Sequence, residues 1–196
     1  NIDTAIAAFE AALAGTPREA NPDDWAMTQI GLGNVYAQRA ADRAESVDRA
    51  IAAYEAAASV LVPASAPAPW VTTRVGLGNA HLDRVRGGRA ENIEASACCP
   101  RLDATVARRA RMPREWATLQ HGQVGAYAIR RIGNHATNLQ RAVDAAEAAL
   151  EVRTRAADPL AWAMTLQNLG IVLMDPDLPG DRSAHQERAL AALEAA

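Results

Sequence analysis

Two adjacent cysteines, Cys98 and Cys99, are followed directly by Pro100, and they are the residues of this chain that look most like a chemical site. A thiolate can act as a nucleophile, but catalysis also needs a base that is held beside it. The sequence positions no histidine next to the pair, and a disulfide between neighbouring cysteines would need a strained ring. We therefore expect no enzymatic site. We interpret the cysteines as small, partly buried apolar side chains in a reducing compartment.

The chain has four histidines, which could also carry metal or proton chemistry: His81, His121, His135 and His185. None of them forms a His-x-x-x-His or Glu-x-x-His pair, the spacings that put two ligands on one helix face. We therefore expect neither a metal site nor a cofactor. His81 falls at a packed position of the pattern described below, so we expect it to be at least partly buried. We expect His135 and His185 to be solvated.

Composition excludes several classes of function. Net charge is -3, and all 20 basic residues are arginines interspersed with acidic ones, so no basic stripe supports nucleic-acid binding. No apolar run is long enough to cross a membrane, and no signal peptide is present. The sequence is rich in alanine and poor in aromatic residues, which favours helices over sheets. We expect a cytoplasmic protein, and because the chain starts with Asn1 we expect it to be a piece of a longer one.

An internal repeat is the main signal in the sequence. Four tryptophans recur at spacings of 45, 46 and 46 residues, and each follows a proline by three positions. The tryptophans are Trp25, Trp70, Trp116 and Trp162, and the prolines are Pro22, Pro67, Pro113 and Pro159. Proline suits the first turn of a helix, where its missing N–H has no helical partner. Each proline therefore predicts the start of a helix, which we call helix A, and Asn21 and Asp158 can cap two of them.

A second amphipathic helix, helix B, follows helix A in each unit, with apolar residues on one face and charges on the other. The pattern predicts a partial repeat over residues 1–20 and repeats over 21–65, 66–111, 112–157 and 158–196. Glycine recurs inside helix A, at Gly33, Gly78 and Gly170. Because an interior glycine costs about 1 kcal/mol relative to alanine, its recurrence predicts that another helix approaches closely there.

The repeats resemble the tetratricopeptide repeat (TPR) family. The residues that carry the resemblance are Leu32-Gly33-x-x-Tyr36 in helix A, Ala50-x-x-x-Tyr54-x-x-Ala57 in helix B, and Pro63 at its end. The period exceeds the usual value of about 34, and the long repeats are similar to those of kinesin light chains and of bacterial multidomain proteins with a caspase-like domain. The resemblance implies an all-α fold, a right-handed superhelical solenoid of antiparallel helix pairs.

The same resemblance implies a protein–protein interaction scaffold within a larger bacterial protein, which binds a protein segment on a concave face lined by helix A. The alternative is an architectural array that only self-associates, and we expect its cut ends to stack on neighbouring copies or on further repeats. The positions carried over from the family are Met27, Ile30, Asn34, Gln38, Thr72, Val75, Asn79, Asp83, Thr118, His121, Gly125, Met164, Gln167 and Ile171. Asn34 and Asn79 can hold a peptide backbone or simply face water. Met27 and Met164 are either ligand anchors or packing residues.

The repeat also explains the cysteine pair. A shift of 46 residues places Cys98 on Ala52, Cys99 on Ala53 and Pro100 on Tyr54. This helix B has lost its aromatic residue and gained an interior proline, which removes a hydrogen bond and clashes with the preceding turn. We therefore predict a break near Cys98–Pro100, with helix resuming over residues 101–109.

Overall fold

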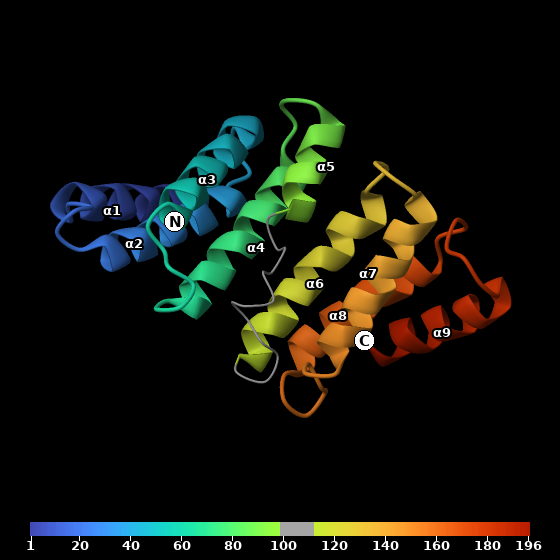
Figure 1. Cartoon of the computed structure of the whole chain (residues 1–196). Helices are drawn as coiled ribbons and strands as arrows, with labels where there is room; N and C mark the ends of the chain where they lie inside the picture. The colour runs from blue at the N-terminus through green and yellow to red at the C-terminus, as the bar shows by residue number, and fades with distance from the viewer. Residues whose placement is uncertain (99–111) are drawn as a thin grey trace. The chain divides into compact units, whose positions relative to one another are not determined.

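The computed structural model describes residues 1–98 and 112–196, and these residues form an all-α fold (Figure 1). The helices are α1 (Ile2–Gly15), α2 (Pro22–Gln38), α3 (Arg43–Ala58), α4 (Pro67–Asp83), α5 (Arg89–Cys98), α6 (Pro113–Ile129), α7 (His135–Leu150), α8 (Pro159–Leu173) and α9 (Arg182–Ala195). The predicted all-α class is thus confirmed. Within the described part of the chain, no helix has the length and apolar character needed to cross a membrane.

The helix starts follow the Pro-x-x-Trp units. The helices α2, α4, α6 and α8 each begin at the predicted proline. The side chain of Asn21 accepts a hydrogen bond from the backbone N–H of Asp24, and that of Asp158 accepts one from Ala161 at 3.0 Å. Both predicted caps are therefore confirmed, and they satisfy backbone donors that the first turn leaves without a helical partner.

The chain divides into two compact units, Asn1–Cys99 and Pro100–Ala196. In the first unit each helix from α1 to α4 packs against the next one, and α2 also contacts α4. The second unit repeats this arrangement: consecutive helices from α6 to α9 pack together, and α6 also contacts α8. Within each unit, therefore, a helix A touches both its own helix B and the neighbouring helix A.

Glycines in α2 and α4 make room for aromatic rings, as the sequence predicted for Gly33. A Cβ atom on Gly33 would lie 2.8 Å from Cε1 of Tyr54, and one on Gly76 would lie 2.6 Å from Cζ of the same ring. Likewise, a Cβ atom on Gly31 would lie 2.5 Å from Cε1 of Phe9 in α1. Such distances are too short for real Cβ atoms, so the rings occupy the space that the missing side chains leave.

The second unit uses other residues at these positions. A shift of two repeats places Val124 at the position of Gly33 and Ala146 at that of Tyr54. Both side chains are buried in one core cluster with Leu139 and Leu169, so a larger residue on helix A accompanies a smaller one on helix B. Gly170 keeps the predicted close approach, because a Cβ there would lie 2.7 Å from Cγ of Leu193 in α9.

Buried polar residues near the start of helix B hold the loops between paired helices. The Nδ2 group of Asn92 donates hydrogen bonds to the carbonyls of Arg84 and Arg86, at 3.2 and 3.0 Å. One repeat later, the same group of Asn138 donates to two carbonyls of the next such loop, at 3.2 and 3.0 Å. Asn92 and Asn138 are 4% and 2% exposed, so these bonds satisfy groups that would otherwise lack partners.

One prediction lies at the edge of what the structure describes. The helix α5 is described as far as Cys98. The predicted break at Cys98–Pro100 and the resumption of helix over residues 101–109 fall outside the described residues.

The glycine that accommodates Tyr54 provides a stability test. We expect Gly33→Ala to lower the free energy of unfolding by about 1–3 kcal/mol, because its Cβ overlaps a ring that is 2% exposed and cannot move aside freely. The matched control is Gly15→Ala in α1, where a Cβ would meet nothing within 4 Å, and we expect a change within about 0.5 kcal/mol. Urea unfolding followed by circular dichroism measures both. Equal stability of the two variants would contradict the close approach.

Candidate functional site

The predicted ligand-contacting residues of the first unit lie on α2 and α4, which touch each other. Most of them are exposed: Met27, Asn34, Gln38, Thr72, Asn79 and Asp83. Val75 is half-buried. Ile30 is only 4% exposed and belongs to a core cluster with Ala57 and Leu61, against which Trp70 of α4 packs. The prediction that Ile30 contacts a ligand is therefore wrong, because this side of α2 is covered by its neighbours.

The exposed amide of Asn34 has a fixed orientation. The hydroxyl of Tyr54 donates a hydrogen bond to Oδ1 of Asn34 at 2.7 Å. Burial raises the pKa of Tyr54 to about 12, so the hydroxyl keeps its proton and acts as the donor. The Nδ2 group of Asn34 is then the part of this amide that can meet the carbonyl of a ligand. Asn79 is also exposed and lies at the same position one repeat later.

Asp83, the last residue of α4, takes part in an ion pair within the unit. Its Oδ2 lies 2.6 Å from Nη2 of Arg43, the first residue of α3. Both side chains are partly exposed, so the pair contributes little to stability. It leaves Asp83 less open to a ligand than the two asparagines.

Thr118 and His121 of α6 direct polar atoms towards α8 and the segment before it. The hydroxyl of Thr165 donates to the carbonyl of Ala161 at 2.7 Å, so its oxygen is an acceptor for its other partners. Those partners are the Arg153 guanidinium and Nδ1 of His121, each at 3.1 Å. Arg153 also donates to the hydroxyl of Thr118 at 3.1 Å. Thr118 and His121 thus belong to the contact between α6 and α8 rather than to an open ligand surface.

Burial decides the protonation of this network. Desolvation, reinforced by the nearby charge of Arg153, lowers the pKa of His121 to about 4. The imidazole is therefore neutral near pH 7, with its proton on Nδ1 facing Thr165. The pKa of Arg153 is also lowered by desolvation, although Asp158 opposes the shift. A neutral histidine beside a hydrogen-bonded arginine avoids two like charges in a half-buried site.

The helix α8 presents an exposed apolar stripe. Met164 is 49% exposed and Ile171 is 60% exposed, and both were predicted at ligand-contacting positions. Leu160 and Met174 extend the stripe, with exposures of 72% and 52%, and the predicted Gln167 is also exposed. Met27 of α2 is 50% exposed, so neither methionine is enclosed by packing. Gly125, at the position of Asn34 in α6, is half-buried.

A cavity of about 320 Å³ between α1, α2 and α3 was not predicted. Its polar groups largely pair with one another. The hydroxyl of Tyr36 donates to Glu10 at 3.0 Å and accepts from Arg49 at 3.0 Å, while Arg39 pairs with Asp3 at 3.0 Å. These internal pairs make it a weaker candidate for ligand binding than the helix faces.

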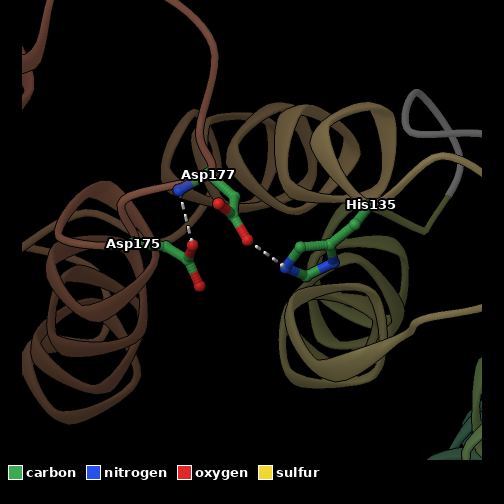
Figure 2. A group of neighbouring side chains, drawn as sticks. All are labelled: His135, Asp175 and Asp177. Atoms are coloured by element: carbon green, nitrogen blue, oxygen red, sulfur yellow. Dashed lines mark hydrogen bonds and ion pairs between the residues drawn. The ribbon is translucent and has the colours of Figure 1, made fainter.

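The histidines do not all follow the predictions. His81 is half-buried, as predicted, and burial lowers its pKa. His135 was expected to be solvated, but its side chain is only 14% exposed. It lies beside Asp175 and Asp177, and among the described residues these three could hold a metal ion, since one ligand atom from each lies within 4.8 Å of the others (Figure 2).

No local pattern predicted this group, because His135 lies 40 residues before Asp175 in the chain. The only local signal was the pair of aspartates in Asp175-Pro176-Asp177. Arg153 was missed for a similar reason, since its contacts Thr118 and Thr165 lie on two different helices.

Comparisons with family models, curated proteins and solved structures give no match to this chain.

The lowered pKa of His121 predicts a pH dependence of stability. The unfolded histidine binds a proton below its ordinary pKa of about 6.5, whereas the folded one does so only near 4. The free energy of unfolding therefore falls as the pH is lowered from about 6.5 to 4, by on the order of 1–3 kcal/mol. His121→Gln should remove this part of the pH dependence in urea unfolding. His185→Gln is the control and should retain the wild-type profile. Parallel profiles for all three proteins would contradict burial of a neutral His121.

Proposed function

We propose that this chain is a TPR-like solenoid that serves as a protein-interaction scaffold. Three features support the proposal: helix pairs that repeat every 45 or 46 residues, neighbouring A helices that touch within each unit, and glycines that admit the aromatic residues of helix B. Solenoids built in this way present one face of successive helices as a continuous surface. The resemblance of the repeats also leads us to propose that the chain belongs to a larger bacterial cytoplasmic protein.

The observation that carries the binding proposal is the pair of exposed asparagines on touching helices. Asn34 on α2 and Asn79 on α4 are separated by one repeat, and α2 contacts α4. Asn34 can donate through Nδ2 and Asn79 can both donate and accept, so the two amides, one repeat apart, can fix the backbone of an extended segment. The exposed Met27 and Thr72 lie seven residues before them and supply apolar and hydroxyl contacts for side chains of the ligand.

This proposal predicts a specific loss of binding. A peptide selected from a displayed library on the immobilised chain should bind more weakly to the Asn34→Ala/Asn79→Ala variant, with Kd raised about tenfold or more, since two side chains that hydrogen-bond the peptide backbone are lost. Isothermal titration calorimetry measures the change. Asn34→Ala also leaves the Tyr54 hydroxyl without its partner, so the single Asn79→Ala variant separates binding from that local effect.

The control for binding is Gln140→Ala on the exposed surface of α7, a helix B. It should leave Kd unchanged within about twofold, because surface changes away from the site are usually small. If the selected peptides bind the asparagine variants as tightly as the wild type, the proposed surface is wrong.

Self-association is the second candidate, and exposed apolar residues favour it. Leu190 and Leu193 of α9 are 59% and 44% exposed, and Ile2 of α1 is 39% exposed. Such residues favour contact with another molecule when they lie together. We expect light scattering to show a mass that rises with concentration, and Leu190→Glu/Leu193→Glu to suppress the rise. A constant monomer mass in both proteins would exclude this candidate.

A further inference from the structure

Three side chains of the second unit converge from two separate segments. His135 is the first residue of α7, and Asp175 and Asp177 lie in the segment that joins α8 to α9. One ligand atom of each lies within 4.8 Å of the other two (Figure 2). The convergence is independent of the asparagine surface on α2 and α4.

The tautomer of His135 follows from its contact with the backbone. Nδ1 lies 3.1 Å from the carbonyl oxygen of Arg130, and because a carbonyl can only accept, Nδ1 must carry a proton. In the neutral ring, Nε2 then offers a lone pair. Figure 2 shows this nitrogen turned towards Asp177, whose Oδ2 lies 3.9 Å away, too far for a hydrogen bond.

Nε2 of His135 is buried and has no hydrogen-bond partner, with less than 1 Å² of its surface exposed. Buried polar atoms normally have partners, and a lone pair that faces a carboxylate is repelled. A positive centre between the two atoms would satisfy both. A histidine that donates Nδ1–H to a backbone carbonyl and offers Nε2 is the usual arrangement of a metal ligand.

The two aspartates are held by their own segment. Oδ1 of Asp175 accepts a hydrogen bond from the backbone N–H of Asp177 at 3.0 Å, and Leu178, which is 7% exposed, anchors the segment in the core. The nearby Nη1 of Arg131 lies 3.7 Å from Oδ2 of Asp177. Two carboxylates against one exposed guanidinium leave the site negative, which favours a divalent cation.

We propose that His135, Asp175 and Asp177 form a binding site for a divalent transition-metal ion such as Zn²⁺. The ligands would be Nε2 of His135 and one carboxylate oxygen of each aspartate, and water would complete the coordination. One imidazole and two carboxylates suit zinc and its neighbours better than Ca²⁺ or Mg²⁺, which prefer oxygen ligands alone.

The ligand atoms must move closer together to bind metal. Ligand atoms about 2.0–2.2 Å from a zinc ion lie roughly 3.3–3.6 Å from one another, whereas Nε2 and Oδ2 are 3.9 Å apart and the three ligand atoms lie within 4.8 Å of one another. The side chain of Asp177 is 62% exposed, so it can rotate towards the ion without disturbing the core. The bound ion would connect the start of α7 to the segment after α8.

The test measures zinc binding to the full chain after dialysis against a chelator, under reducing conditions. Because thiolates also bind zinc, the measurements use the Cys98→Ser/Cys99→Ser chain beside the wild type. Calorimetry should show one saturable ion in the cysteine-free chain, with affinity lowered at least tenfold by His135→Gln and by Asp175→Asn/Asp177→Asn. Saturating Zn²⁺ should raise Tm by roughly 5 °C. Circular dichroism establishes that each variant is folded.

Matched controls lie nearby. His185→Gln removes a histidine from α9, and Asp144→Asn removes an exposed carboxylate from α7, and neither belongs to the group. Both should bind zinc as the wild type does. The Co²⁺ form of the cysteine-free chain should show visible absorption bands that His135→Gln abolishes. The proposal is overturned if the cysteine-free chain binds no zinc, if His135→Gln binds it equally well, or if Ca²⁺ and Mg²⁺ bind as tightly.

Discussion

The side chain of Tyr54 sets the spacing of three helices in the first unit. Its ring fills the space that Gly33 leaves on α2 and Gly76 leaves on α4, and its own backbone belongs to α3. A Cβ on either glycine would overlap the ring, so the helices approach only because both side chains are absent. The hydroxyl then reaches Asn34 at 2.7 Å and orients an amide on the exposed face of α2. One packing constraint thus fixes both the core and part of the candidate surface.

The second unit meets the same geometric demand with different chemistry. Val124 is larger than the glycine at the same position of α2, and Ala146 is smaller than the tyrosine at the same position of α3. Ala146 has no hydroxyl that could reach the surface. A half-buried network takes over the contact between helix A neighbours: Arg153 donates to Thr118 and Thr165, and Thr165 accepts from His121. Burying a guanidinium is costly unless its donors are satisfied, and here two of the N–H groups of Arg153 donate to hydroxyl oxygens. A polar network of this kind also tolerates less change than an apolar contact, since each lost partner leaves another group unsatisfied.

Local signals in the sequence were sufficient to predict where the helices begin, but not which residues come together in the candidate sites. The Pro-x-x-Trp units predicted the starts of α2, α4, α6 and α8 because a proline and a capping residue act within one turn. Recurring glycine also predicted the close approach at Gly33, because an interior glycine destabilises a helix and its recurrence therefore indicates a neighbour that needs the space. Ile30 was predicted on the ligand-contacting face but is buried, because its burial depends on Trp70 of the next helix pair. His135 was predicted to be solvated but is largely buried, and its neighbours Asp175 and Asp177 lie 40 or more residues further along the chain. Periodicity tells which residues share a face, but not which face the neighbouring helices cover.

The two proposed sites use different parts of the repeat, and this separation has a physical basis. Apart from Asn34, whose Oδ1 accepts a hydrogen bond from the Tyr54 hydroxyl, exposed positions of helix A can vary without affecting the glycine–aromatic contacts, so they are free to recognise a ligand. The proposed metal site uses the loops, where Asp175 directly follows Met174, the C-cap of α8. An ion there would fix the end of the helix that carries the exposed apolar residues Met164 and Ile171. The metal ion would then affect binding of a protein ligand only if it changes the position or order of α8. Two ligands are coupled only when each binds two states of the protein with different affinities.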